Sequence, residues 1–246
     1  MERRVAVVTG ASRGIGLSVS LELLRLGYTV AAVGSSTESF RYNPRSEVEE
    51  SGHYKRFFCN LVNENEIIGL AEDVTEWATR VDVLVNVAGR IDIAQIESAT
   101  FKSWDEVIAV NLRAPYFLVK AFLACLKVAE HGRIINISSN AGRMGGVSNG
   151  LAYSASKGGL ISLTYGLASR LAQYGITANT IAPGPVSTDM LSTRAPSELE
   201  NIRQRIPLGR FGHCDEVSNA VAYFASPESS YTTGSVLDVN GGLFMG

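Results

Sequence analysis

The sequence predicts an α/β fold: a doubly wound parallel sheet with helices on both faces. Short apolar segments rich in β-branched residues alternate with segments of helical periodicity along the 246 residues. The first of these apolar segments runs directly into a glycine-rich loop and a helix. No linker or shift of composition interrupts the alternation, so we expect residues 1–246 to form a single domain.

The first three elements are expected to form a βαβ unit. Residues 5–8 are a continuous apolar run that stops before Gly10, as in a buried strand. Residues 17–26 repeat apolar side chains at helical spacing until Gly27 ends the pattern. Residues 28–33 are a second apolar run. Strands joined by a helix in this way lie parallel, and the crossover is right-handed.

The same alternation continues along the rest of the chain. We expect a kink or join at Pro115 within a long helical region, because proline has no backbone N–H to donate. Residues 183–206 are rich in proline and polar residues, and we expect 187–206 to form a mobile lid over the substrate. The remaining strands are expected at 56–59, 81–85, 133–137, 177–182 and 235–239, and the remaining helices at 64–80, 104–128, 153–174 and 215–224.

The composition is that of a folded protein with a buried core, with 46% hydrophobic and 19% charged residues. A net charge of −2 argues against nucleic acid or an anionic membrane as a partner. Cys59, Cys125 and Cys214 form no C-x-x-C pair, so we expect no metal site. The apolar segment near the N-terminus is too short for a signal peptide, and no uninterrupted apolar run approaches the roughly 18 residues of a transmembrane helix. We therefore expect a cytoplasmic location.

The first glycine loop, residues 10–16, has the spacing G-x-x-x-G-x-G. Glycine serves such a loop by allowing a tight turn, close approach of the backbone to a phosphate, and close packing of helix on strand. The helix that follows would point its free N–H groups and the positive end of its dipole at a pyrophosphate. The alternative is a tight turn without a ligand. The position directly after the first strand favours dinucleotide binding.

The end of the second strand indicates which dinucleotide would bind. NAD-binding sites usually carry an acid here, about 20 residues beyond the glycines, to hold the ribose 2′-OH. This chain has Ser35 and Ser36 instead, with no acid before Glu38. Arg13, inside the glycine loop, could pair with a 2′-phosphate, although a loop arginine can also simply face water. Together these residues favour NADP(H) over NAD(H).

Tyr153 and Lys157 are four residues apart, which places them on one face of a helix. A free tyrosine hydroxyl titrates at about pH 10 and is a weak acid-base catalyst at neutral pH. A neighbouring ammonium would lower that pKa toward the working range. Such a pair often arises by chance, so its meaning depends on the motifs around it.

These motifs occur in an order that resembles the short-chain dehydrogenase/reductase family over essentially the whole chain. Within the family the sequence is most similar to the 3-oxoacyl-acyl-carrier-protein reductase branch, because of segments 9–16, 206–212 and 239–242. The resemblance implies a Rossmann fold and a nicotinamide-dependent reaction that interconverts a ketone and a secondary alcohol. The motifs that carry it are the glycine loop 10–16, the segment 86–89, Asn111, Ser139, Tyr153 and Lys157.

The resemblance also implies a role for each motif residue. Tyr153 would be the general acid that protonates the carbonyl oxygen, and Lys157 would lower its pKa and hold the nicotinamide ribose. Ser139, rather than its neighbour Ser138, would hydrogen-bond the substrate oxygen. Asn111 would link Lys157 through water to a proton relay. Cofactor contacts are expected at Gly10, Ser12, Arg13, Gly14, Ile15, Gly16, Ser35, Ser36, Asn60, Leu61, Asn86, Ala88, Gly89, Tyr153, Lys157, Pro183, Gly184, Val186 and Thr188.

Two departures from the family pattern concern the substrate. A carrier-protein reductase is expected to show a basic docking patch, yet Glu130 and Tyr174 stand where we would look for it. The glycine-rich loop 142–150 is one residue longer than the family pattern, and Arg143 within it could either read an anionic substrate group or face water. The basic residues near the expected docking patch are Lys127, Arg133 and Arg170.

The sequence therefore predicts an NADP(H)-dependent oxidoreductase whose leading substrate is a 3-oxoacyl thioester, carried on acyl carrier protein or CoA. Small ketones, sugars or secondary metabolites are the alternative substrates. A non-catalytic dinucleotide-binding regulator is the alternative from another class, although such a protein has no chemical need for all four catalytic residues. The resemblance further implies a homotetramer with helices 104–128 and 153–174 in one interface, but burial within the domain would equally explain their apolar character.

Overall fold

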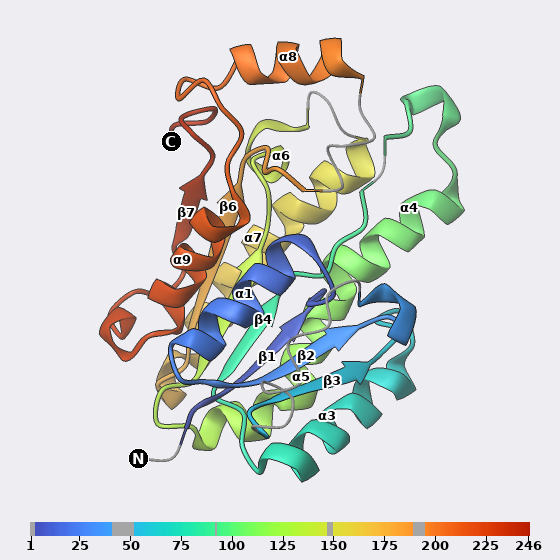
Figure 1. The fold of residues 1–246 in the computed structure, drawn as a ribbon. Helices are drawn as coiled ribbons and strands as arrows, with labels where there is room; N and C mark the ends of the chain where they lie inside the picture. Colours follow the sequence, from blue (N-terminus) through green and yellow to red (C-terminus); the bar gives the residue numbers. More distant parts are fainter. Residues whose placement is uncertain (1–2, 41–51, 92, 147–149, 189–194) are drawn as a thin grey trace.

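The computed structural model describes residues 3–40, 52–91, 93–146, 150–188 and 195–246 (Figure 1). Seven strands in these segments form one parallel sheet in the order β3-β2-β1-β4-β5-β6-β7. Successive strands are added on one side of β1 (β2 and β3) and then on its other side (β4 to β7), so the sheet is doubly wound. The predicted fold class is therefore confirmed. The strands are β1 (Val5–Thr9), β2 (Thr29–Gly34), β3 (Tyr54–Phe58), β4 (Val83–Asn86), β5 (Arg133–Ile137), β6 (Thr177–Pro183) and β7 (Val236–Val239).

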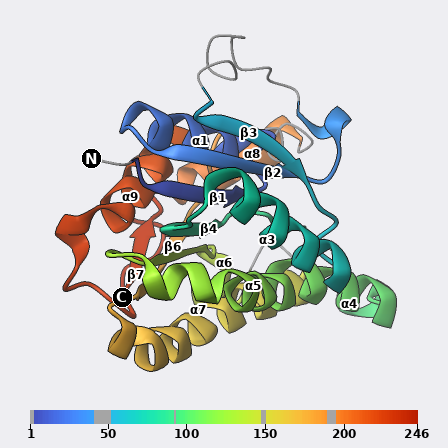
Figure 2. The ribbon, with the colours of Figure 1, turned by 90° about the horizontal axis from the view of Figure 1, so that it is seen from below.

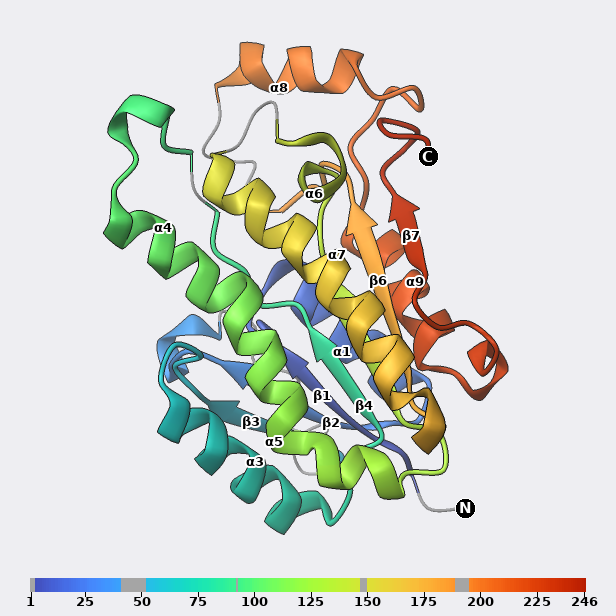
Figure 3. The same cartoon turned by 180° about the vertical axis from the view of Figure 1, so that it is seen from behind.

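Helices cover both faces of the sheet (Figures 2 and 3). On one face, Leu23 of α1 and Phe224 of α9 pack against the apolar side chains of the central strands. On the other face, Leu70 of α3, Phe122 of α5 and Leu167 of α7 do the same. The helices are α1 (Gly14–Arg25), α3 (Glu64–Ala78), α4 (Phe101–Ile108), α5 (Ala114–Val128), α6 (Ala141–Met144), α7 (Leu151–Leu171), α8 (Pro196–Gln204) and α9 (Cys214–Ala225). Short helical turns are η1 (Thr37–Ser39), η2 (Ile96–Ser98), η3 (Ala109–Arg113), η4 (Ala172–Tyr174) and η5 (Pro227–Ser229).

A row of buried polar side chains crosses the centre of the sheet. Asn86 donates to the Asn136 amide oxygen at 2.8 Å, and Asn136 donates to the Thr164 hydroxyl at 2.9 Å. The hydroxyl of Thr180 donates to Thr164 at 2.9 Å. The row therefore joins β4, β5 and β6 to α7 through hydrogen bonds that are shielded from water.

The long helical region around Pro115 is interrupted, as predicted, but by a change of helix type. The turn η3 is π-helical, and the N–H of Ala114 donates to the carbonyl of Ala109, five residues back. Pro115 has no N–H for the carbonyl of Asn111, so a regular α-helix would lose a bond here anyway. Single π-turns inside α-helices occur often at functional sites.

The excursion between β6 and α9 contains a helix that the sequence did not predict. The expected helices included none between residues 183 and 206, but α8 occupies Pro196–Gln204 and lies across the carboxyl end of the sheet (Figure 1). Proline suits the first turn of a helix because its missing N–H is not needed there. Part of the expected lid, residues 189–194, lies outside the described residues.

The helical stretch Phe101–Val128 is long and apolar enough to cross a membrane by length and composition alone, with a mean hydropathy of 1.5. The core helix of a protein without a membrane segment meets the same test. Leu118, Phe122 and Leu126 of α5 are buried against the sheet. Packing within the fold therefore explains the apolar face of α5, whereas Phe101 and Trp104 at the start of the stretch are exposed.

Candidate active site

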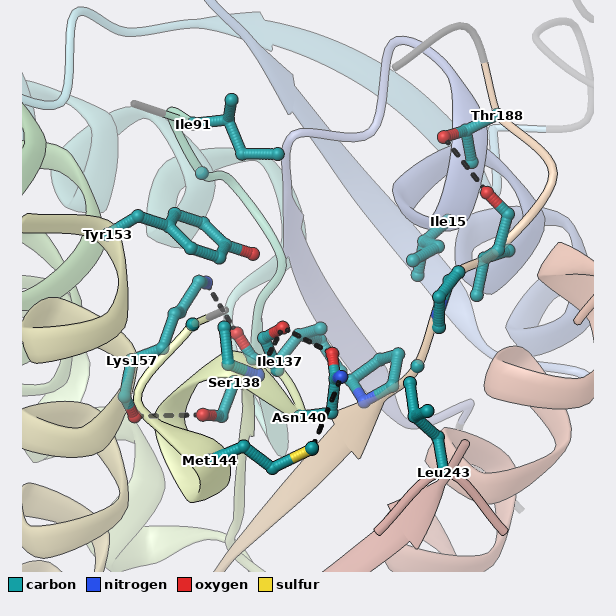
Figure 4. A pocket seen from close by; sticks show the side chains of 18 of the residues that line it. Ile15, Ile91, Ile137, Ser138, Asn140, Met144, Tyr153, Lys157, Thr188 and Leu243 are labelled. Atoms are coloured by element: carbon teal, nitrogen blue, oxygen red, sulfur yellow. Dashed lines mark hydrogen bonds between the residues drawn. The ribbon is translucent and has the colours of Figure 1, made fainter. Parts of the chain in front are cut away.

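The carboxyl ends of the strands meet at one edge of the sheet, where a cavity of about 220 Å³ opens (Figure 4). It is lined by the first turn of α1, by the segments that follow β4, β5 and β6, by the start of α7, by α8 and by the segment after β7. Ligands of doubly wound sheets bind at this edge. Nine of the predicted site residues line the cavity: Ile15, Gly89, Ser139, Tyr153, Lys157, Pro183, Gly184, Val186 and Thr188.

Tyr153 and Lys157 lie one turn apart near the start of α7 and both border the cavity (Figure 4). The Lys157 ammonium donates to the main-chain carbonyl of Ile137 at 2.7 Å and lies 5.9 Å from the centre of the Tyr153 ring. Lys157 is only 3% exposed, and this burial lowers its pKa to about 8. The side chain can therefore change its protonation state close to neutral pH.

The pKa of Tyr153 is raised, which is opposite to the expected lowering. Removal of water from the hydroxyl is the main cause, because desolvation disfavours the charged phenolate. A hydrogen bond with Ser139 lowers the pKa, but by less than burial raises it. The neutral phenol is thus the stable form in this state, as a proton donor requires.

The structure distinguishes the two adjacent serines. The Ser138 hydroxyl donates to the main-chain carbonyl of Lys157 at 2.8 Å, so it fastens α7 to the end of β5. The Ser139 hydroxyl accepts from the N–H of Ala141 at 3.1 Å, donates to the amide oxygen of Asn140 at 3.2 Å, and lowers the pKa of Tyr153. This arrangement favours Ser139 as the residue that meets the substrate oxygen.

Asn111 lies in the π-turn η3 and is completely buried, but it does not line the cavity. Its amide oxygen accepts from the N–H of Arg90 at 2.7 Å, and its amide nitrogen donates to the Arg90 carbonyl at 2.9 Å and to the Ser156 hydroxyl at 3.0 Å. These bonds tie the loop after β4 to α7. The water link between Asn111 and Lys157 stays a prediction.

The glycine loop has the shape that a dinucleotide phosphate would need. Gly10 has a φ of +65°, and a Cβ there would lie 2.9 Å from the backbone of Ala88. A Cβ on Gly16 would lie 2.1 Å from the carbonyl oxygen of Gly10. No side chain caps the start of α1, and its first turn contains no acid. The first N–H groups of α1 therefore remain available to an anion, so these residues fit a nicotinamide dinucleotide.

The other predicted cofactor residues lie along the same edge of the sheet but outside this cavity. Arg13 and Ser35 are exposed, whereas the Asn86 side chain is buried and turned toward Asn136. The amide oxygen of Asn86 has no hydrogen-bond partner in the described part of the chain. Asn60 is exposed, and its N–H donates to Glu66. The full set outside the cavity is Gly10, Ser12, Arg13, Gly14, Gly16, Ser35, Ser36, Asn60, Leu61, Asn86 and Ala88.

Arg143 neither lines the cavity nor faces water, in contrast to both expectations for it. Its guanidinium donates to the main-chain oxygen of Gly246 at 2.7 Å and lies 3.5 Å from the Asp238 carboxylate. It also stacks over the Phe244 ring, 4.7 Å from the ring centre. These partners leave the side chain only 17% exposed.

Sequence reasoning missed several side chains that shape the cavity. Ile91 and Met144 lie a few residues beyond recognised motifs, and Leu243 directly follows the glycine pair at 241–242. Proximity to those motifs was the only available signal, because loop residues have no periodicity. Ile202 and Arg205, from α8 and its end, fall within the expected lid 187–206, but no motif singled them out.

Comparison with known proteins agrees with this geometry. Residues 10–244 match the family model described as enoyl-(acyl carrier protein) reductase. The chain is 36% identical to 3-oxoacyl-[acyl-carrier-protein] reductase FabG of Escherichia coli (strain K12), over 99% of this chain and 98% of that protein. It is 35% identical to the FabG of Vibrio cholerae, over 100% and 99%, and 34% identical to the FabG of Aquifex aeolicus, over 99% and 98%. The chain is therefore an oxidoreductase with a nicotinamide dinucleotide cofactor, and it belongs to the short-chain dehydrogenase/reductase family.

Proposed function

We propose that the protein is an NADP(H)-dependent reductase of 3-oxoacyl thioesters, acting on substrates carried on acyl carrier protein. The observation that supports this most is the meeting of Tyr153, Ser139 and Lys157 at one cavity, beside a glycine loop shaped for a phosphate. The names of the full-length relatives point to the same substrate class.

The chemistry assigned to the chain's own residues is proton delivery and charge stabilisation. The bound cofactor supplies the hydride. The Ser139 hydroxyl would donate to the substrate oxygen as negative charge develops on it, and Tyr153 would give that oxygen its proton. Lys157, with a pKa near 8, would replace the proton on Tyr153 through its ammonium group. Asn111 would hold the loop and helix that frame this path.

The preference for NADP(H) rests on Arg13. Its side chain is exposed in the glycine loop, where a 2′-phosphate could pair with it. Ser36 is a weaker candidate, because it lies beside the Glu38 carboxylate. The pKa of Glu38 is lowered by a backbone N–H and by Ser36, so this carboxylate is ionised at neutral pH.

Docking of an acidic carrier protein would depend on few basic residues. Arg133 is excluded, because its side chain is buried and donates to the carbonyls of Gly132 and Ser226. Lys127 lies over the ring of Tyr174, with its ammonium 4.0 Å from the ring centre, and Arg170 is exposed. We therefore assign any carrier docking near this surface to Lys127 and Arg170.

We also propose a cytoplasmic homotetramer of single-domain chains, with residues 187–206 acting as a lid. Large apolar side chains are exposed on α4 and α7, which overlap the helical regions 104–128 and 153–174 assigned to the interface; Phe101, for example, is 92% exposed. Apolar exposure of this kind marks contact surfaces. The other members of this group are Trp104, Leu151 and Tyr165.

Reduction of small ketones is the second candidate function. Ligand pockets usually measure about 300–1,000 Å³, and this cavity of about 220 Å³ lies below that range. Its walls include the apolar side chains of Ile91, Ile137 and Leu243. A compact, mainly apolar cavity suits a small ketone as well as the end of an acyl chain.

A substrate panel followed by NADPH absorbance separates these functions. Acetoacetyl-acyl carrier protein should be reduced far faster than acetoacetyl-CoA, diketones or sugars, and its advantage should fall as salt screens the docking charges. Faster turnover of a diketone or sugar would favour the second candidate. Tyr153→Phe should lose nearly all turnover while NADPH binding stays close to normal. Full activity of that variant would disprove the assigned proton donor.

A further inference from the structure

Arg143 lies on α6, the one-turn helix that follows Ser139. This helix packs backbone to backbone against α7: a Cβ on Gly142 would lie 2.6 Å from the main-chain carbonyl carbon of Lys157. The N–H of Ala141, at the start of α6, donates to the Ser139 hydroxyl. Helix α6 is therefore rigidly attached to the catalytic residues on one side.

The Arg143 side chain connects α6 to β7 and the residues after it. The guanidinium touches Gly246, Asp238 and Phe244 at the distances given above. Arg143 and Asp238 are only 17% and 18% exposed, so water and salt screen this ion pair much less than a surface pair. A planar guanidinium can bond a carbonyl and stack on a ring at the same time, which an ammonium cannot do.

Residues 240–246, which we name the terminal segment, form part of the cavity wall through Leu243. Two hydrogen bonds form within this segment. The Asn240 side chain donates to the Phe244 carbonyl at 3.0 Å, and the N–H of Gly242 donates to the Asn240 amide oxygen at 2.9 Å. Fixing Phe244 and Gly246 therefore also fixes the position of Leu243. Met144, the residue after Arg143, borders the same cavity (Figure 4).

We propose that Arg143 is a positioning residue for substrate selectivity. By holding the terminal segment against α6, it keeps Leu243 at the cavity wall and limits the length of acyl chain that fits beside the reacting carbonyl. This inference rests on the proposed function, because it takes a 3-oxoacyl thioester as the substrate. It assigns the Arg143 charge to this contact and not to an anionic group of the substrate.

Steady-state kinetics over 3-oxoacyl thioesters of increasing length test the proposal. Arg143→Gln should raise KM for the shortest substrate about tenfold. It should also shift the ratio of kcat/KM for long chains to kcat/KM for short chains about tenfold toward long chains. The reason is that one methylene group in such a pocket changes the discrimination between two substrates about 10–200-fold. The kcat for the shortest substrate should stay within about twofold, because the variant leaves the proton-donating groups in place. The Kd for NADPH should not change.

Two further variants show whether Arg143 acts through Leu243. Leu243→Ala should move the chain-length profile in the same direction, and the double variant should shift it little further, because both changes open one wall. Arg143→Lys keeps the charge near Asp238 but loses the stack, so it should restore only part of the wild-type profile. Arg25→Gln is the matched control: it breaks an exposed pair with Glu22 on α1 and should change nothing.

Hydrogen exchange gives a readout that does not depend on the substrate. Amides of 240–246 should exchange faster in Arg143→Gln than in wild type or Arg25→Gln. If wild type reduces no thioester, the proposed function fails, and this exchange comparison still decides whether Arg143 holds the segment. An unchanged chain-length profile, additive effects with Leu243→Ala, or unchanged exchange would overturn the proposal. If Arg143→Gln fails to fold, Arg143→Lys carries the same comparisons.

Discussion

The catalytic role proposed for Lys157 is combined with a cost in stability, and replacing the residue separates the two. Its ammonium is buried, and the only hydrogen bond described for it goes to the carbonyl of Ile137. Methionine has a similar length and no charge to desolvate. We therefore expect Lys157→Met to abolish turnover and to stabilise the cofactor-free protein at pH 7.

The magnitude follows from the pKa of Lys157, which burial lowers from 10.5 to about 8. At 1.36 kcal/mol per pH unit, this drop corresponds to about 3 kcal/mol of lost stability while the side chain is charged. Losing the hydrogen bond to Ile137 costs the variant about 1–2 kcal/mol. The net gain in the free energy of unfolding is then about 1–2 kcal/mol, a rise in Tm of about 2–8 °C for a chain of this size.

The pH dependence gives the sharper test. Between pH 8 and 10.5 the folded lysine is neutral while the unfolded lysine is still protonated, so the unfolded state binds more protons. Wild-type stability should therefore rise with pH in this window relative to Lys157→Met, and the advantage of the variant should disappear by about pH 10. Below about pH 7, where the lysine is protonated in both states, the difference should be constant.

Urea unfolding of both proteins at one protein concentration, from pH 7 to pH 10, measures these differences. Lys102→Met, at an exposed lysine of α4, is the control and should stay within about 0.5 kcal/mol of wild type at every pH. Parallel stability curves for wild type and Lys157→Met, or a less stable variant at pH 7, would refute the reasoning.

Three further predictions concern the rest of the site. Ser139→Ala should lower kcat about 100-fold or more, as loss of an oxyanion donor does. Ser138→Ala should keep most of its activity and lose about 1–2 kcal/mol of stability. Steady-state kinetics and urea unfolding distinguish the two variants, and equal kcat losses would contradict the assignment. Gly16→Ala should abolish NADPH binding in a fluorescence titration, because the new methyl group would lie 2.1 Å from the Gly10 oxygen. Arg13→Ala should weaken NADPH far more than NADH, and an equal loss would remove the 2′-phosphate argument.

The elements predicted best are those whose pattern is local. The expected strand 133–137 coincides with β5, because all five of its residues are buried and apolar side chains dominate the run. Helix α8 was missed for the converse reason. None of its residues is buried, so it has no apolar stripe from which a helix could be predicted.

The site residues were predictable where a motif carried them, and their surroundings were not. The spacing of Tyr153 and Lys157 predicted that both lie on one face of a helix. The pKa of each, however, depends on burial by residues distant in the chain. Arg143 was misread for the same reason. Gly246, which accepts a hydrogen bond from Arg143, lies 103 residues away in the sequence, and no local sequence pattern predicts such a contact.

The buried polar row at the centre of the sheet has a consequence for how the strands align. Strands covered on both faces are apolar on both faces, so a slip of one residue would exchange one apolar side chain for another at little cost. Asn86 lies opposite Asn136, and Asn136 lies opposite Thr180, so a slip would leave amides and hydroxyls unpaired in the core. The row thus acts as a register lock, and the alignment of Ser139 with Tyr153 depends on it.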